Sequence, residues 1–336
     1  MPVKREGGAN MYRYVIKRIL MMIPVMLGVT FVIFSMMYIS EGDPARMILG
    51  EGAQEAEVEA LREELGLNDP FLTRYVNYIK GIVTEGDLGV SYTTGRSVSE
   101  EIFDRWPTTM LLAVLSVLLA TAIGVPTGII SATKQYSIFD NLAMVLALVG
   151  VSMPNFWQGL VLILVFSVYL GILPPSGFYG PMYWILPAVT IGTSTAATIT
   201  RMTRSSMLDV IRQDYIRTAR AKGLSERVTI TRHALKNALI PIITVVGLQF
   251  GRGLGGAILT ESIFSIPGLG KLMVDSIKSR NYPVVQGGVL FIAIAFSLIN
   301  LLVDILYAYA DPRIKSQYQG HSKRKKKSAG KAGKAA

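Results

Sequence analysis

The sequence contains no cysteine and only two histidines, and these absences exclude several classes of function. Without cysteine there is neither a disulfide framework nor a thiolate metal site, and we expect no metal site in this chain. The pattern Gly-x-x-x-x-Gly-Lys-Ser/Thr, which binds nucleotide phosphates in many ATPases, does not occur. The zinc-binding pattern His-Glu-x-x-His is also missing. The chain is therefore not expected to hydrolyse ATP itself.

Charged residues are rare in the long apolar stretches, with one each in the last two, as is typical of a membrane protein. The hydrophobic content is 51% and the mean hydropathy is +0.41, which exceeds what one water-soluble core of this length needs. Residues 19–39 hold no ionisable side chain, over about the 20 positions needed to cross a bilayer core. We predict an all-α, polytopic protein whose six transmembrane helices are residues 19–39, 108–131, 141–173, 183–200, 238–260 and 284–310.

The distribution of basic residues predicts the orientation, because an excess of Lys and Arg marks the cytoplasmic side. Residues 1–18 carry five of them, residues 201–237 nine and residues 311–336 nine, whereas residues 261–283 carry three. Both termini and the 201–237 loop are therefore predicted to be cytoplasmic, in a cell (inner or plasma) membrane. The formal net charge of +11 does not indicate nucleic-acid binding, since the basic residues collect at span ends and in alternate loops.

The third predicted span is too long for one straight helix. Residues 141–173 would extend about 50 Å as a helix, against a bilayer core of about 30 Å. The sequence Met153-Pro154-Asn155 interrupts this stretch, because proline removes an amide donor and clashes with the preceding turn. Two spans here would make seven and would place the basic 201–237 loop outside. We therefore interpret the stretch as one span that is kinked or broken near Pro154.

The largest segment on the outer side is predicted to be residues 40–107, with 14 acidic against six basic residues. Asn68-Asp69-Pro70 predicts a helix start there. Apolar residues follow it at helical spacing: Phe71, Tyr75, Ile79 and Val83. We expect short helices against the outer face of the membrane, and a solvated linker is the alternative. The basic, low-complexity residues 321–336 are typical of a disordered cytoplasmic tail.

Small residues recur at every fourth position in two predicted spans. In lipid such residues let helix backbones approach closely, so we predict helix contacts at these positions. The stripes are Gly124 and Gly128, flanked by Ala120 and Ala132, in the second span, and Gly247, Gly251 and Gly255 in the fifth.

Five residues are candidates for a translocation pathway. Thr193, Ser194 and Thr195 lie in a run of small and hydroxylated residues, 188–200, which is either a polar wall of a pathway or a packing surface whose hydroxyls bond to their own helix. Arg252 and Asp304 are ionisable residues inside spans, where an unpaired charge costs at least about 2.5–3.5 kcal/mol. Asp304 can instead cap the inner end of its span among basic groups and lipid headgroups.

The loop 201–237 is predicted to be a docking surface, because its nine basic residues stand against three acids between two apolar runs. A helix is predicted to stop at Lys222-Gly223 and another to start near Leu224-Ser225. Glycine permits the left-handed turn that ends a helix. A helical stripe able to pack beneath the spans precedes it: Leu208, Ile211, Tyr215 and Ala219. The alternative is a basic loop that only fixes orientation.

Several long motifs, in the same order, resemble the permease subunits of binding-protein-dependent ABC importers, in the dipeptide/oligopeptide branch. Residues 214–241 read DYIRTARAKGLSERVTITRHALKNALIP. The others are GDLGVSYTTGRSVSEEIFDRWPTTMLLA at 86–113, SMPNFW at 152–157, ESIFSIPGLGKLMVDSIKSRNYPVVQG at 261–287 and DPRI at 311–314. The resemblance covers nearly the whole chain except the extreme N-terminus and the basic tail. The large outer segment after the first span resembles that of the first of two permease subunits.

The resemblance implies a type I ABC importer permease-like bundle that forms half of a translocation pathway. It also implies a second homologous permease subunit, two ATP-binding subunits on the cytoplasmic side that hold ATP and Mg, and an extracytoplasmic substrate-binding protein. The solute would be peptide-like. Relatives of this branch take dipeptides, longer peptides, nickel chelates, glutathione or some saccharides, and no motif in the sequence reads a ligand.

In that family the cytoplasmic loop follows a pattern of Glu-Ala-Ala, three residues and Gly, and it contacts the ATPase. By position Gly223 matches the Gly and Ala219 the second Ala, whereas Arg217 stands where Glu is expected. Lys236 occupies the position of a later Pro, and Pro241 comes five residues after it. The ATPase-coupling residues implied by the resemblance are Arg217, Thr218, Ala219, Arg220, Ala221, Lys222, Gly223, Leu224, Ser225, Glu226 and Arg227.

Two other classes of function are weighed against the importer. An ion-coupled secondary transporter or channel would need inverted repeats or conspicuous intramembrane carboxylates, and the sequence offers no clear repeat and a single such acid, Asp304. An integral-membrane enzyme would need a nucleophile–base pair or a metal set. The two histidines, His233 and His321, lie in the loop and the tail, so they do not form one.

Overall fold

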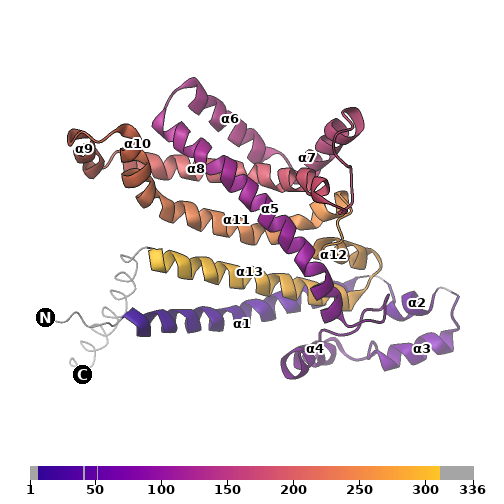
Figure 1. Ribbon diagram of the computed structural model, residues 1–336. Coiled ribbons are helices and arrows are strands. Elements are labelled where there is room, and N and C mark those ends of the chain that lie inside the picture. Colours follow the sequence, from indigo (N-terminus) through magenta and orange to yellow (C-terminus); the bar gives the residue numbers. More distant parts are fainter. Residues whose placement is uncertain (1–6, 41, 51, 311–336) are drawn as a thin grey trace, which may run out of the picture.

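The computed structural model describes residues 7–40, 42–50 and 52–310, and this part of the chain is helical with short connections. Long helices run alongside one another, and short helices gather mainly at the two ends of the bundle (Figure 1). The predicted basic tail, residues 311–336, lies outside the described residues. The all-α class predicted from the apolar runs is confirmed.

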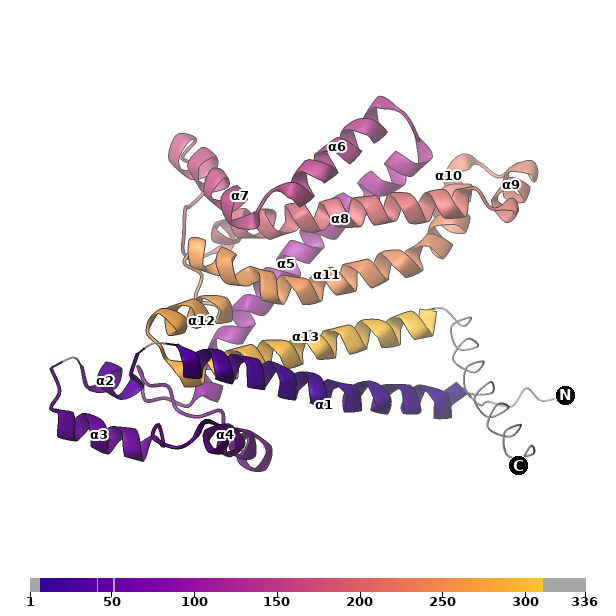
Figure 2. The ribbon, with the colours of Figure 1, turned by 180° about the vertical axis from the view of Figure 1, so that it is seen from behind.

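The bundle has a central part and an edge. α5 (Val98–Thr133), α8 (Ile185–Ile211) and α11 (Leu235–Ile263) form its centre, with the closest packing between α5 and α8. α1 (Gly7–Ile39) and α13 (Tyr282–Ala310) lie side by side along one edge (Figures 1 and 2). Many apolar side chains of α1 are exposed, as expected for a helix whose solvent is lipid.

Four helical stretches of the described residues are long and apolar enough to cross a membrane: Val15–Ile39, Val98–Thr133, Glu226–Gly255 and Tyr282–Leu306. α8, which contains the predicted fourth span, is not among them, because it is rich in Thr and Ser and carries charges after residue 200. Its apolar and hydroxylated side chains are instead buried against the other helices of the bundle. Six spans are compatible with this arrangement, and the count remains a prediction.

The third predicted span is broken where the sequence places a proline. α6 (Ile138–Ser152) is followed by Met153, which is extended as expected for a residue before proline, and α7 (Asn155–Leu162) begins after Pro154. α7 continues as a π-helical turn, Ile163–Tyr169. The two arms meet at an angle of 104°, so the pair is either one broken span or a re-entrant loop. A 3-10 turn, Pro181–Trp184, leads on into α8.

Short helices occupy the segment between α1 and α5, as the sequence predicts. They are α2 (Pro44–Leu49), α3 (Glu55–Glu64) and α4 (Phe71–Glu85). We call residues 40–97 the outer segment, after its predicted side. It ends where α5 begins at Val98, and the predicted limit of the extracytoplasmic segment at residue 107, which falls within α5, remains a prediction.

The small residues of two stripes lie where helices touch. A Cβ atom added at Gly124 would lie 2.8 Å from the Ala196 carbonyl oxygen. The backbones of α5 and α8 can therefore come this close only because residue 124 has no side chain. Gly128, Gly247 and Gly251 are similarly enclosed, the last two by α13. A Cβ at Gly255 would have no neighbour within 4 Å in the described part of the chain. The stripe of the fifth helix therefore contacts α13 over its first two glycines.

Candidate functional site

The predicted loop 201–237 is largely an extension of two long helices. α8 runs on to Ile211, and α11 begins at Leu235. Between them lie α9 (Asp214–Ala221), α10 (Glu226–Val228) and a π-helical turn, Thr229–Ala234. We call residues 212–234 the coupling unit; it projects at one end of the bundle (Figure 1).

The coupling unit is mounted on a buried apolar cluster. Ile216 of α9 is fully buried, and Ile230 and Ala234 join it from the following turn. Their partners come from the ends of three long helices: Ala132 of α5, Met207 of α8, and Ala238 and Ile242 of α11. Packed side chains thus connect α9 directly to the ends of three long helices at the centre of the bundle.

The sequence predicted that Leu208, Ile211, Tyr215 and Ala219 form one helical stripe beneath the spans. This prediction is wrong for Tyr215, and the stripe does not lie on one continuous helix. The helix breaks at Arg212 and Gln213, so α9 starts with a new orientation. This turns Ile216 inward and leaves Tyr215 43% exposed, with its hydroxyl bonded to the Asn237 side chain at 2.6 Å. The periodicity argument assumed a single helix through this break and therefore selected the wrong neighbour.

The turn between α9 and α10 occurs where the sequence predicts it. Gly223 has a φ of +80°, which glycine adopts at no steric cost, and its amide donates to the Arg220 carbonyl at 2.9 Å. Across the turn the Arg220 guanidinium donates twice to the Glu226 carboxylate, at 2.7 and 3.0 Å. This pairing lowers the pKa of Glu226 below its usual range. Both side chains are substantially exposed, so the pair fixes the turn geometry more than it stabilises the fold.

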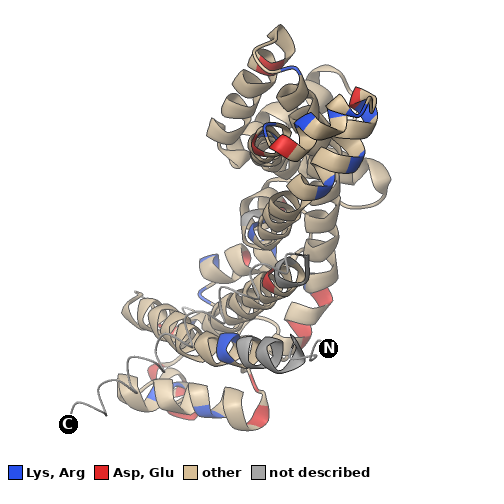
Figure 3. Cartoon of the chain, turned by 90° about the vertical axis from the view of Figure 1, so that its left-hand side faces the viewer, with Lys and Arg blue, Asp and Glu red and all other residues tan. Residues whose placement is uncertain are grey.

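The outward surface of the coupling unit is basic with apolar patches. Residues 220–228 are all exposed, and they present Lys222 and Arg227 beside Leu224 and Val228. Figure 3, viewed from this end, shows Lys and Arg gathered around the unit. Ala219, which belongs to the predicted stripe beneath the spans, is 8% exposed, and its role as a coupling residue remains a prediction. The accessible part of the coupling unit is therefore the turn and not the inner face of α9.

The coupling candidates before the turn lie on the exposed side of α9. Arg217 forms an ion pair with Asp214 at 3.6 Å, and Thr218 donates to the Asp214 carbonyl at 3.0 Å. Ala221 and Ser225 are exposed on either side of Gly223. Thus the resemblance-based candidates other than Ala219 are accessible in this chain, and their contacts remain a prediction.

At the opposite end, the connection from α11 to α13 is held by a buried carboxylate. We call residues 261–283 the outer closure; it contains α12 (Leu269–Lys278). Glu261 is fully buried and accepts from the Thr109 hydroxyl at 2.6 Å and the Lys271 amide at 3.0 Å. The Thr109 hydroxyl in turn accepts from the Leu269 amide at 2.8 Å. Burial raises the pKa of Glu261, although its hydrogen bonds with Thr109 and with backbone amides oppose this.

A second buried polar residue joins the outer closure to the outer segment. Asn281, 1% exposed, donates to the hydroxyls of Ser91 and Thr93 at 2.8 and 3.0 Å and accepts from the Tyr92 amide at 3.0 Å. Neither Glu261 nor Asn281 was singled out from the sequence. The sequence signal for Glu261 was its position as a lone acid at the end of an apolar run. Nothing near it in the sequence indicates Thr109, its hydrogen-bond partner 152 residues away.

A buried ion pair joins α6 to α8 and was also missed. Arg204 donates to both oxygens of Asp140 at 2.6 and 2.7 Å, and the Ser131 hydroxyl of α5 donates to the same carboxylate. Asp140 is 1% exposed. Because the pair is bidentate and enclosed, it fixes the first arm of the broken third span to the bundle.

The pathway candidates lie in three separate places. Thr193 donates to the Val189 carbonyl at 2.7 Å and Ser194 to the Ile191 carbonyl at 3.3 Å, while Thr195 is buried. Arg252 is exposed on α11 and donates to Gln249 at 3.3 Å. Asp304 pairs with Arg18 of α1 at 2.8 Å, as a residue that caps its span among basic groups would. The structure does not bring the candidates together, and a pathway role for each remains a prediction.

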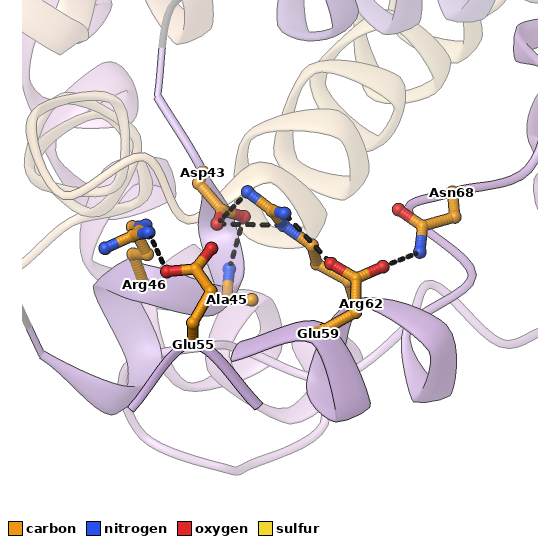
Figure 4. Close-up of polar contacts among 7 residues, drawn as sticks. All are labelled: Asp43, Ala45, Arg46, Glu55, Glu59, Arg62 and Asn68. Carbon is orange, nitrogen blue, oxygen red and sulfur yellow. Dashed lines mark hydrogen bonds and ion pairs between the residues drawn. The ribbon is translucent and has the colours of Figure 1, made fainter. Parts of the chain in front are cut away.

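The outer segment is organised by a charge network (Figure 4). Arg62 of α3 pairs with Asp43 at 2.9 Å and Glu59 at 3.0 Å, and Asp43 also caps the start of α2. Glu59 accepts from Asn68 at 2.7 Å. Beside this network lies a cavity of about 480 Å³, bounded by the ends of α1 and α13. Asp43 and Arg62 neutralise each other at its wall.

Comparison with known proteins identifies the family. Residues 124–316 match the family model "Binding-protein-dependent transport system inner membrane component", and residues 11–113 match the corresponding N-terminal model. The chain belongs to this family. It is therefore a permease subunit of an ABC importer, and it is not an enzyme. This membership excludes the ion-coupled transporter, the channel and the membrane enzyme.

Curated relatives in this family include peptide permeases. The dipeptide transport system permease protein DppB of Alkalihalophilus pseudofirmus is 47% identical over 333 residues, covering 91% of this chain and 100% of that protein. DppB of Escherichia coli (strain K12) is 43% identical, covering 91% and 99%. The glutathione transport system permease protein GsiC of the same strain is 44% identical over 305 residues, covering 91% and 99%.

The fold of the importer family is also seen in a solved structure. An inward-facing structure of the MetNI methionine ABC transporter matches with a TM-score of 0.52 and 17% identity, covering 63% of this chain and 97% of that chain. This permease is thus a multi-pass membrane protein with the type I importer fold, as the resemblance implied.

Proposed function

We propose that this permease transports short peptides or peptide-like solutes. The observation that supports this best is its 43–47% identity to dipeptide permeases over essentially their full length. A glutathione permease is similarly related. Both solutes carry amide bonds, a free amine and free carboxylates, so the proposed class is defined by these groups.

An uptake experiment tests this class. Vesicles containing the complete transporter are given a labelled dipeptide with unlabelled dipeptide, glutathione or a disaccharide as competitor. We expect competition from the peptides and none from the disaccharide. Uptake of the saccharide, with no peptide competition, would contradict the proposal.

We further propose that the working assembly contains a second homologous permease, two ATP-binding subunits and a substrate-binding protein on the far side. ATP and Mg bind to the partner subunits, since this sequence has no phosphate-binding loop of its own. Purification of the tagged permease followed by mass spectrometry should recover these partners. Uptake by this chain reconstituted alone would contradict the assembly.

The proposed role of the coupling unit is to pass ATPase movement to the spans. The support is its construction: an exposed basic turn at residues 220–228 sits on a cluster shared by α5, α8 and α11. Closing and opening of the ATPase subunits would then rock these helices as a rigid body. The proposed role requires the coupling unit and both termini to be cytoplasmic, which is also what the positive-inside rule predicts.

The orientation has a direct test, because the chain contains no cysteine. A membrane-impermeant thiol reagent should label Ala56→Cys in the outer segment of cells whose outer envelope has been opened. It should label Lys222→Cys only after the membrane is permeabilised. The reverse pattern would overturn the orientation.

A further inference from the structure

α4 presents three distinct faces along its length. Phe71, Tyr75 and Tyr78 pack their rings against α1. A second face is aliphatic and open, with Leu72, Val76 and Val83 exposed by 65%, 54% and 77%. A third is polar and includes Thr73, Asn77, Lys80 and Thr84, all exposed. At about 100° per residue these sets occupy different sectors of the helix.

The contact between α4 and α1 lies deep within the apolar run of α1. The Tyr75 hydroxyl lies 3.0 Å from that of Thr30 and 3.1 Å from the Leu27 carbonyl oxygen. Thr30 is about 13 Å from the end of α1 at Ile39, at a rise of about 1.5 Å per residue. A bilayer core is about 30 Å thick, so the Tyr75 hydroxyl reaches close to its middle.

The aromatic contacts show that the body of α4 lies at the depth of the same leaflet. Phe31 contacts the Phe71 and Tyr75 rings at 5.9 and 5.5 Å, and Phe34 contacts the same rings at 5.4 and 5.5 Å. Figures 1 and 2 both place α4 beside the last third of α1, whereas α3 lies beyond the end of that helix. The aliphatic face of α4 therefore lies beside the apolar run of α1, residues 19–39, which is predicted to cross the bilayer core.

The polar groups of α4 are arranged for such a position. Asn77 and Arg74 line the cavity under the rest of the outer segment, and Arg74 also lies over the Tyr38 ring at 5.6 Å. The Thr84 hydroxyl donates to the carbonyl of Lys80 within the helix. Long basic side chains such as Lys80 can extend to the headgroups while their stems remain in apolar surroundings.

We propose that α4 is embedded in the leaflet that holds the C-terminal end of α1, with Leu72, Val76 and Val83 among the acyl chains. The occupant of this face is lipid, because α1, on which α4 packs, also exposes apolar side chains in the same part of its length, including Val32 at 57% exposure. The sequence predicted that these short helices lie against the outer face of the membrane. The contacts of α4 with α1 support a deeper position for α4, within the leaflet. α4 thereby braces α1, which otherwise packs mainly on α13.

The test uses the absence of cysteine from the chain. Leu72→Cys, Val76→Cys and Val83→Cys are each labelled with a bimane fluorophore in the complete transporter, in vesicles of phosphatidylcholine and phosphatidylglycerol. Quenching by lipid brominated along the acyl chain is compared with quenching by aqueous iodide. Val32→Cys on α1 is the reference for lipid contact, and Ala56→Cys, exposed on α3, is the reference for water.

The proposal expects severalfold stronger quenching by brominated lipid at the three α4 positions than at Ala56→Cys, approaching that at Val32→Cys, with weak iodide quenching. Iodide quenching equal to that at Ala56→Cys would overturn it, because the face would then be in water. Protection from both quenchers would also overturn it, since a protein partner would cover the face. Val76→Asp provides a second readout: it should lower the yield of membrane-integrated transporter more than Ala56→Asp does.

Discussion

The coupling unit and the outer closure are both short connections between long helices, and they are built in opposite ways. The outer closure is held by enclosed polar groups: Glu261 and Thr109 fix the start of α12, and Asn281 fixes its other end. The coupling unit has an apolar underside centred on Ile216 and an open upper surface whose one bidentate ion pair is exposed.

The difference indicates which connection is complete within this chain. Buried polar groups cost free energy when they lose a partner, so the hydrogen bonds of Glu261 and Asn281 restrict the arrangement of the outer closure. The basic and apolar side chains of the turn at residues 220–228 are exposed, so they do not need partners within this chain. We infer that the coupling unit acquires its full set of contacts only in the assembled transporter.

The largest expected effect is on transport, from Gly223→Pro. Proline cannot adopt a φ of +80° and removes the amide that donates to Arg220. The turn must therefore rearrange, and a loss of about 1–3 kcal/mol of coupling free energy corresponds to a loss of uptake of about 5- to 150-fold, with membrane insertion retained. Uptake and ATPase rates of the reconstituted transporter measure this.

Gly50→Pro is the matched control for that prediction. Gly50 also has a positive φ, of +90°, and its amide donates to a carbonyl in the preceding helix, but it lies in the outer segment. It should leave uptake coupled to ATP hydrolysis. If both variants uncouple uptake from ATP hydrolysis equally, the effect does not depend on whether the altered turn lies in the coupling unit.

The next effect is on thermal stability, when a side chain is added to a glycine in each of the two connections. A Cβ at Gly270 would lie 2.5 Å from the Ile258 Cα atom, so Gly270→Ala should destabilise the fold by about 1–3 kcal/mol. Gly223 faces open space, and asparagine tolerates its backbone conformation, so Gly223→Asn should cost less than about 1 kcal/mol. Thermal aggregation midpoints of the purified proteins compare them. An equal decrease in both would remove the distinction.

Loss of one hydroxyl tests the polar construction of the outer closure. Thr109→Val leaves the Leu269 amide without its acceptor and removes a donor to Glu261, at a cost of about 1–3 kcal/mol. Thr231→Val in the coupling unit removes an exposed hydroxyl bonded within its own helix and should change the midpoint little. Thr109→Ser should restore most of the stability. No difference between the two valine variants would argue against the buried network.

The smallest effect is a dependence on pH. Burial raises the pKa of Glu261, so the folded protein binds this proton more tightly than the unfolded chain does. The contribution of Glu261 to stability is therefore most favourable at low pH and decreases as pH rises from the ordinary glutamate pKa through the raised value. The thermal midpoint relative to the non-titrating Glu261→Gln should fall over this interval. A relative midpoint that rises with pH would contradict the assignment.

The sequence was a reliable guide wherever a local rule applies. The apolar runs gave the long helices, Pro154 marked the break in the third predicted span, and Gly223 marked the turn of the coupling unit. Each feature depends on the conformational limits of one residue or on the length of one run. The prediction failed at Tyr215, because an unpredicted break at residues 212 and 213 changed which residue of α9 turns inward.

The sequence by itself therefore determined the class of the protein, its long helices and the position of its coupling turn. Only the tertiary structure decided that Thr109 pairs with Glu261, that Asp304 pairs with Arg18 and that α4 crosses α1 deep in its apolar run. The physical reason is the distance along the chain over which each interaction acts. Backbone preferences and hydropathy act over a few residues, whereas these contacts join positions far apart in the chain whose pairing depends on how whole helices pack.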